Sequence, residues 1–365
     1  MAEYSDGKTK SSSSNKYVSK ILRIVIPIVI SVGLCYMLFN GIDLDEMILV
    51  IKHDCDFSWI IFGMILSVIA QIIRALRWQI QLRALEINVP LFPVVLSIFG
   101  TYAVNLVFPR LGEIWRTGYI ASRQKSPFSI VFGSMVADRI ADLILVGIIA
   151  LITFSLASSS MLAFVERYPA FYDALISIVC SPFTWIALFI GIILLWRIYV
   201  HYSHRTLMTK LRTVLLRLWE GFAVVLHMKG RIAWCMLSLI LWGCYFMQLY
   251  VAFFSFTCTR ELLAANGMIC ALVCFVLSSM AMAVPSNGGI GPWQLAVIFA
   301  LTLFAPSDMS VEAAEAFRIN VTAFANIVMG METLLLIVLG LFTFICVFFD
   351  KQKDGAKDRE ISSVG

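Results

Sequence analysis

Three short stretches of this sequence combine residue types that could bind an anion in apolar surroundings. The first is NLVFPRLGEIWR, residues 105–116, which follows an apolar run and places Arg110, Glu113 and Arg116 around a proline and a glycine. Arginine suits a phosphate because its planar fork donates two parallel hydrogen bonds and keeps its charge. The stretch is therefore either a surface loop or a deeper polar site for a phosphate-bearing ligand.

The second stretch is ADRIADL, residues 137–143. Asp138 and Asp142 are four residues apart and so share one face of a helix, with Arg139 beside them. If this helix begins near Pro127, Asp138 lies about 16 Å along it at 1.5 Å per residue. The three residues could form an ion pair that locks two helices, or they could line a pathway for a substrate or protons. The sequence leaves both interpretations open.

The third stretch is AVPSNGGIGPWQ, residues 283–294, in which prolines and glycines interrupt an apolar run. Gly288, Gly289 and Gly291 would let backbone N–H groups approach a ligand. A helix that begins at Pro292 would attract an anion to its N-terminus. A glycine-rich turn alone is a weak signal, and this one gains weight only from its placement in the chain.

Polar residues outside these three stretches are weaker evidence for a binding or catalytic site. Glu332 lies well inside the last apolar segment, where it could pair with an arginine from the other half of the chain or act directly at a site. Asn320 and Asn326 are expected to form hydrogen bonds between helices. The four histidines fall in loops or the connector, the nine cysteines form no C-x-x-C pair, and there is no P-loop. We therefore predict no catalytic constellation, no metal and no cofactor.

The elements that must position these residues are almost entirely apolar. The 365 residues are 60% hydrophobic and 14% charged, with a mean hydropathy of +0.89, whereas soluble domains carry about 25% charged residues. The apolar runs lack the alternation of barrel strands, so an all-α polytopic membrane protein is predicted. The net charge of +5 gathers in loops and indicates topology rather than nucleic-acid binding. Apolar segments are expected at 21–39, 57–73, 91–108, 130–155, 181–196, 232–256, 264–284, 293–304 and 317–348.

The distribution of lysine and arginine predicts which loops are cytoplasmic. The basic residues 1–20 are expected to be a disordered cytoplasmic N-terminus, the acidic loop that follows lies outside, and the loop with Arg74, Arg77 and Arg83 lies inside. If 91–108 then crossed the membrane, the basic connector at 197–231 would lie outside, against the rule. The conflict disappears if 91–122 is a hairpin that enters from the cytoplasm and turns at FPRLG.

A second interruption falls in the segment 264–304, which leaves from the outside and returns there, either as a hairpin or as a full span followed by a short one. Helix, hairpin and helix then recur upside down, which is typical of transporters whose site lies near the bilayer midplane. We predict about six full spans and two re-entrant hairpins in a single transmembrane domain. This domain spans 21–349 and contains repeat one at 57–155, an amphipathic cytoplasmic connector at 197–231 and repeat two at 232–348. A cytoplasmic tail follows at 350–365.

The three stretches resemble those of the lysylphosphatidylglycerol synthetase transmembrane-region family, also called flippase-like integral membrane proteins, over about residues 20–350. They are similar to the family patterns N…P-x-R-x-G-E-x-x-R, E-R-x-x-D and P-x-x-G-G-x-G-x-x-E. The better understood members flip aminoacylated phosphatidylglycerol, and others handle lipid-linked or polyprenyl-phosphate sugars. The resemblance implies a substrate-binding site made of Asn105, Arg110, Glu113, Arg116, Asp138, Arg139, Asp142, Gly288, Gly289, Gly291 and Gln294. We add Glu332 to this site because it lies well inside the last apolar segment.

The chain departs from the family pattern at two of these positions. Gln294 and Asp138 each stand where the family usually has glutamate, so one acidic function is replaced by an amide and another has a shorter reach. The related synthetases carry their aminoacyl-transfer chemistry in a soluble domain after the membrane part. Only the polar residues 350–365 follow Phe349, so we expect that this chain does not make lysylphosphatidylglycerol by itself.

The leading expectation is a translocase in the cell inner membrane, with both termini cytoplasmic. It would flip an anionic phospholipid or a polyprenyl-phosphate-linked lipid through a polar midplane cavity. The alternatives are an intramembrane lipid-modifying transferase and a membrane scaffold for a partner enzyme. The expected partners are the bilayer and a lipid with an anionic head group, and the tryptophan-rich helix faces leave room for a homodimer.

Overall fold

The computed structural model describes residues 44–157, 206–306 and 309–364, together with five residues between 181 and 190. The N-terminus at 1–20, the apolar segment at 21–39 and nearly all of 181–196 lie outside the described residues. Within the described ranges every regular element is a helix. The helices are α2 (Leu44–Asp54), α3 (Phe57–Ala84), α4 (Leu91–Val107), α5 (Leu111–Arg123), α6 (Phe128–Leu156), α10 (Thr206–His227), α11 (Arg231–Ala252), η1 (Phe253–Ser255), α12 (Thr257–Asn266), α13 (Met268–Ala281), α14 (Pro292–Leu303) and α15 (Val311–Val364).

Four described helices are long and apolar enough to cross a bilayer: α3, α6, α11 with η1, and the part of α15 from Val311 to Asp350. A fifth span results if α12 and α13, which are bent by 113° at their junction, count as one. The structure therefore confirms a polytopic α-helical membrane protein. The count of about six spans stays a prediction.

The first long helix is longer than expected. The apolar pattern predicted its end at residue 73, whereas α3 continues to Ala84 and includes Arg74 and Arg77. The two arginines are buried, with 3% and 0% of their surface exposed. They were expected in a cytoplasmic loop, and that expectation is wrong because neighbouring carboxylates compensate their charge inside the helix bundle.

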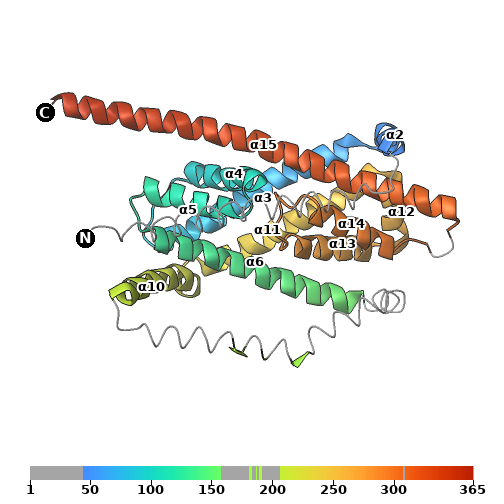
Figure 1. Cartoon of the computed structure of the whole chain (residues 1–365), viewed down its shortest axis with the longest axis horizontal. Helices are drawn as coiled ribbons and strands as arrows, with labels where there is room; N and C mark the ends of the chain where they lie inside the picture. Colours follow the sequence, from blue (N-terminus) through green and yellow to red (C-terminus); the bar gives the residue numbers. More distant parts are fainter. Residues whose placement is uncertain are drawn as a thin grey trace, which may run out of the picture.

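The shorter helices form two broken pairs that point toward each other. Figure 1 shows α4 and α5 in one half of the elongated molecule and α13 and α14 in the other, with α3, α6, α11 and α15 running along its length. The tips of the pairs meet, because the guanidinium of Arg110 donates to the carbonyl oxygen of Ala283 at 2.6 Å. A Cβ atom at Gly288 would collide with the side chain of Leu106. Neither α13 nor α14 reaches the ~20 residues of a full span.

The break between α4 and α5 follows from a few residues. Phe108 is extended, Pro109 cannot donate a backbone hydrogen bond, and Arg110 adopts a left-handed conformation with φ of 65°. The helices then pack closely, since a Cβ atom at Gly112 would collide with the carbonyl oxygen of Thr101. The predicted turn at FPRLG is confirmed as a turn between packed helices, and its entry into the membrane from the cytoplasm stays a prediction.

The two halves of the chain pack antiparallel along α3 and α11. At one end the N–H of Asp56 donates to the carbonyl oxygen of Ser255 at 2.8 Å, and near the other end Arg77 donates to Ser238 at 3.2 Å. Each half therefore holds a long helix, a broken pair and a second long helix in an order that agrees with the predicted inverted repeat. The repeat itself stays a prediction.

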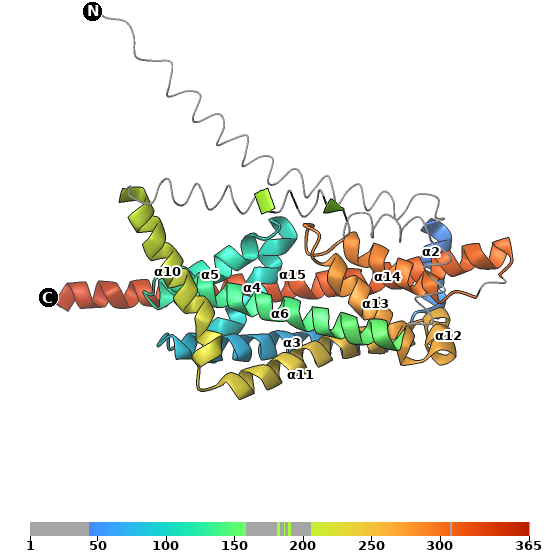
Figure 2. The ribbon, with the colours of Figure 1, turned by 90° about the horizontal axis from the view of Figure 1, so that it is seen from below.

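The two ends of the molecule are formed by different helices and carry different charges. Figures 1 and 2 show α10 and the C-terminal part of α15 at one end, and α2 and α12 at the other. The first end carries the basic last turns of α3 and α5, with Arg83 and Arg123. The second end carries acidic residues, of which Asp56 caps α3 by accepting from Ser58 N–H at 3.0 Å. Residues expected there as an acidic loop form α2 instead.

The connector at 197–231 contains α10, which packs tightly on α6. A Cβ atom at Gly221 would collide with the carbonyl oxygen of Ile130, and one at Gly133 would collide with that of Leu218. Because both contacts involve backbone, the two helices cross at small residues. The described part of the connector is mostly helical as predicted, since α10 spans Thr206–His227, and its place at the cytoplasmic surface stays a prediction.

Candidate functional site

A buried group of four ionised side chains joins α3 to α6. Arg74 contacts Asp142 at 2.9 Å, and Arg77 contacts Asp138 at 2.7 Å and Asp142 at 2.8 Å. Arg74 and Asp138 are 3.6 Å apart. Each arginine therefore bridges both carboxylates, and each carboxylate faces two arginines. We call these four residues the α3–α6 charge cluster.

The helix α11 closes the charge cluster from a third side. The indole N–H of Trp242 donates to Asp142 at 3.3 Å, and Arg74 donates to the hydroxyl of Tyr245 at 3.2 Å. Polar side chains thus surround the ions where lipid tails could not solvate them. Of the two interpretations of Asp138 and Asp142, the structure shows the ion pair between helices, and it neither requires nor excludes a pathway.

The arginines of this cluster were missed as site residues. The hydropathy pattern places both arginines in a loop, because an apolar run ends at the first charged residue. A helical pattern would have found them, since Ser67, Gln71, Arg74 and Trp78 recur at intervals of three or four residues on α3. Such a polar stripe within an apolar helix predicts a face buried against other polar groups.

The hairpin α4–α5 reaches the cluster through Arg139. Its guanidinium lies 3.4 Å from a carboxylate oxygen of Glu113 and 3.8 Å from Asp142. The amide of Asn105 donates weakly to Glu113 at 3.5 Å, and its oxygen accepts from the N–H of Gly112 at 2.8 Å. The side chains of Arg139 and Glu113 are 34% and 19% exposed, so they form the accessible edge of the site.

Arg116 lies behind this edge without an anionic contact. It is fully buried, and its guanidinium stacks on the ring of Trp78 at 4.3 Å. None of its side-chain nitrogens has a hydrogen-bond partner among the described residues. Arg139, Asp138, Arg74 and Glu113 are near enough to act on it electrostatically.

The positive and negative charges of the α3–α6 charge cluster and its neighbours are not equal in number. The charge cluster with Arg139, Glu113 and Arg116 contains four arginines and three carboxylates, which leaves one formal positive charge. An isolated buried cation is costly, so a site with this excess attracts an anion. We call the seven residues the arginine–carboxylate network.

The glycine-rich stretch lies at the tip of the second broken pair. Gly288, Gly289 and Gly291 all have positive φ angles, of 64°, 91° and 94°. The N–H of Gly291 donates to the side-chain oxygen of Gln294 at 2.6 Å, and the amide of Gln294 donates to Asn326 at 3.1 Å. Gln294 therefore caps α14 from within the chain, and it is a structural residue whatever else it binds.

Glu332 has no arginine partner among the described residues. One of its carboxylate oxygens accepts from the hydroxyl of Ser67 at 2.6 Å and the other accepts from the amide of Gln248 at 3.0 Å. Of the two alternatives for Glu332, a pairing with an arginine is not found among the described residues, and a direct role at a site stays a prediction. Asn326 bonds to a neighbouring helix as predicted, whereas Asn320 donates to Ala316 on its own helix at 2.8 Å.

Residues 24–330 match the family model for the lysylphosphatidylglycerol synthase TM region. The chain belongs to this family. No curated protein and no solved structure matches the chain. Membership in the lysylphosphatidylglycerol synthase TM region family indicates a role connected with membrane lipids in a multi-pass membrane protein. The matched range includes all three stretches and ends just before Glu332.

The family's three motifs converge only in part. The first and second meet in the network through Arg139 and Glu113, at 3.4 Å. The third joins the first at the tips, where exposed Arg110 binds the backbone of Ala283. Arg110 is thus directed to the second broken pair, away from the contacts of Arg116. Glu332 is held by other helices and belongs to neither meeting point.

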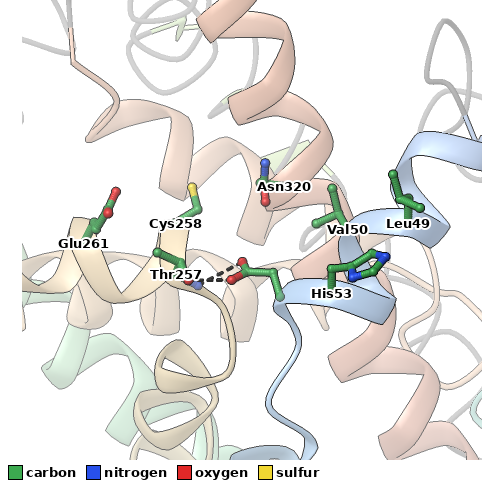
Figure 3. Close-up of a pocket in the computed structure, with 8 residues that line it drawn as sticks. Leu49, Val50, His53, Thr257, Cys258, Glu261 and Asn320 are labelled. Atoms are coloured by element: carbon green, nitrogen blue, oxygen red, sulfur yellow. Dashed lines mark hydrogen bonds between the residues drawn. The ribbon is translucent and has the colours of Figure 1, made fainter.

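A separate open pocket of about 580 Å³ lies between α2, α12 and α15. Figure 3 shows His53, Glu261 and Asn320 around it. The N–H of Thr257 donates to Asp54 at 3.0 Å, so this carboxylate caps α12. The pocket lies at the end of the molecule opposite to α10 and contains none of the predicted site residues.

Proposed function

We propose that this protein moves a lipid with an anionic head group between the two leaflets of a membrane. The observation that carries the proposal is the unbalanced positive charge of the arginine–carboxylate network. Arg116 supplies a buried guanidinium without a hydrogen-bond partner among the described residues, and Arg139 supplies a half-buried one at the edge. A phosphate that contacts Arg139 would also be attracted by the buried charge of Arg116, since these two guanidinium groups act on each other electrostatically.

The surroundings of the network support a lipid rather than a soluble anion. Large apolar residues of α6 are exposed, among them Leu143, Leu151 and Ile152, at 69%, 71% and 54%. Acyl tails can remain on such a surface while the head group reaches the network on the same helix. The meeting of the two broken pairs supplies polar backbone between the two ends of the molecule.

A lipid-modifying transferase is the weaker alternative. It would need a carboxylate able to accept a proton from a reacting group. Asp138 and Asp142 each contact two arginines within 4 Å, so their oxygens are occupied by ion pairs between helices. Glu113 is also engaged, by Arg139 and Asn105. These contacts suit carboxylates that position arginines.

The proposal is tested with purified protein in vesicles that contain a small fraction of fluorescent phosphatidylglycerol. A membrane-impermeant quencher then reports how fast label moves between leaflets. We expect Arg116→Gln and Arg139→Gln each to slow this movement by about tenfold or more, since a hydrogen bond to a charged group contributes ~1.5–3 kcal/mol. Arg318→Gln is the matched control, because Arg318 pairs with Glu315 near the start of α15.

Two results would overturn the proposal. One is wild-type protein that moves the acidic lipid no faster than empty vesicles do. The other is equal movement by the wild type and both network variants. Mass spectrometry of the same vesicles tests the transferase alternative, since a covalently altered lipid would support lipid modification.

A further inference from the structure

Glu332 differs from the carboxylates of the arginine–carboxylate network in the side chains that it contacts. The carboxylates of the network are all within 4 Å of an arginine, whereas Glu332 is held by two neutral side chains, Ser67 of α3 and Gln248 of α11. Both oxygens are bonded, so the carboxyl group points inward between these helices. Ser67 is the eleventh residue of α3, about 15 Å from its start at 1.5 Å per residue.

Within the part of the chain that the structure describes, the helices packed around Glu332 bring no cation to this carboxyl group. On α3 the nearest charged residue along the same face is Arg74, which is engaged by Asp142 and Tyr245. On α11 the neighbouring ionisable groups are Cys244 and Tyr245. The sequence of α14 contains no ionisable side chain, and that of α4 contains only Tyr102. The charged residues of α2 and α12 lie at the far end of the molecule: Asp45, Glu46, Lys52, His53, Asp54, Arg260 and Glu261.

These two partners can serve both protonation states of Glu332. A serine hydroxyl donates to a carboxylate and can instead accept from a carboxyl O–H, while a glutamine amide donates in either case. An unpaired carboxylate at membrane depth is expensive, and its protonation removes that cost. The site therefore allows a proton to bind and leave without new partners.

A stripe of polar residues connects Glu332 with the network. Gln71 follows Ser67 by one turn of α3, and Arg74 follows Gln71 by another. Gln71 is only 3% exposed, and its side-chain oxygen has no hydrogen-bond partner among the described residues. A buried polar atom of this kind is normally satisfied by water or a ligand. The stripe thus provides a polar connection between Glu332 and the charge cluster.

We propose that Glu332 binds and releases one proton in each transport cycle, so that a pH difference across the membrane drives the movement of lipid. This inference rests on the proposed function. Glu332 holds a proton while the carboxyl group is buried against Ser67 and Gln248, and loses it when the helices rearrange. The network binds the head group, and Glu332 supplies the coupling to protons.

The test uses the same vesicles with a pH difference of one unit across the membrane. If one proton accompanies each lipid, the wild type should accumulate labelled phosphatidylglycerol in one leaflet by up to about tenfold, because one pH unit changes the proton ratio tenfold. Glu332→Gln should still equilibrate the label but leave the leaflets equal. Glu315→Gln is the control, since Glu315 lies on the same helix and is 63% exposed.

Two measurements keep the inference testable if Glu332→Gln does not fold. A pH-sensitive dye trapped in wild-type vesicles should report proton movement that accompanies lipid movement. Infrared spectra of the wild type should contain a protonated carboxyl band that titrates with pH, and Glu332→Asp should shift that band. A wild type that moves lipid with no proton movement would overturn the coupling while leaving the proposed function intact.

Other outcomes separate the two proposals. If the wild type moves no lipid at all, the proposed function fails first. Suppose that Glu332→Gln fails to move only those lipids that have an amine in the head group, and that it fails at every pH. Glu332 then binds a cationic group, and the proton inference is wrong. Unchanged gradient-driven accumulation in Glu332→Gln would also overturn it.

Discussion

At the scale of single residues, the energetics of the site depend on how its charges are paired. Asp142 contacts Arg74 and Arg77 and lies 3.8 Å from Arg139. Desolvating these ions opposes their attraction, so the cluster adds little net stability compared with an apolar core. Removal of one partner is different, because it leaves the others buried without compensation.

Asp142→Leu should therefore lower the free energy of unfolding by about 3–5 kcal/mol, because it leaves two buried arginines with one carboxylate. The exposed pair of Asp350 with Arg123 is the matched control, and Asp350→Asn should cost no more than about 1 kcal/mol. Thermal and denaturant unfolding in detergent measures both variants. Equal losses would show that the buried cluster is no more important to stability than a surface pair.

Arg110 permits a second prediction at this scale. Its φ of 65° disfavours any residue with a Cβ atom, by about 1–2 kcal/mol. Arg110→Ala and Arg110→Gly both lose the hydrogen bond to Ala283, but only glycine relieves the backbone strain. Arg110→Gly should thus unfold at a higher temperature than Arg110→Ala. The reverse order would contradict the left-handed conformation at this position.

At the scale of elements, the broken pair α4–α5 depends on close backbone approach near its tip. The pair α4–α5 is held by the contact of Gly112 with the Thr101 carbonyl and by the bond from Gly112 to Asn105. A side chain at this position must separate the helices. The separation would also shift Glu113, and with it the contact to Arg139.

Gly112→Ala should lower the free energy of unfolding by about 1–3 kcal/mol through this collision. Gly118 is a control on the same helix, since a Cβ atom there meets nothing within 4 Å. Gly118→Ala should be neutral or stabilising by about 0.5–1 kcal/mol, because alanine favours a helix. The prediction is checked by comparing the unfolding of both variants, and a harmless Gly112→Ala would refute the packing of the pair.

At the scale of the whole molecule, the two ends differ in charge. The helix α10 and the basic end of α5 lie at one end, and the acidic starts of α2 and α15 lie at the other (Figure 1). This arrangement agrees with α4–α5 entering from the cytoplasm and α13–α14 from the outside. It therefore predicts which positions a reagent reaches in intact cells.

Ser122 and Glu312 are exposed positions at these two ends. Labelling of Ser122→Cys with a membrane-impermeant thiol reagent should occur only after the cells are permeabilised. Glu312→Cys should be labelled in intact cells, above the level of the parent chain. Labelling of Ser122→Cys from outside would break the predicted topology of the first pair.

Much of the architecture could be predicted because it depends on local patterns. Pro109 lacks a backbone donor, and three glycines clustered between Pro285 and Pro292 favour non-helical backbone, so both breaks were correctly predicted. Apolar runs predicted the long helices, although their ends were missed where arginines continue the helix. Asp138 and Asp142 were found because a helix of fixed geometry puts residues four apart on one face.

The partners of those residues depend on which helices meet. The amino-acid sequence by itself determined a polytopic helical membrane protein of this lipid-related family, because composition and motifs are local properties. Only the tertiary structure decided that Arg74 and Arg77 neutralise the aspartates, that Arg116 faces no carboxylate directly, and that Glu332 is held by neutral groups. These facts follow from the packing of α3 against α6, α11 and α15, which joins residues far apart in the chain.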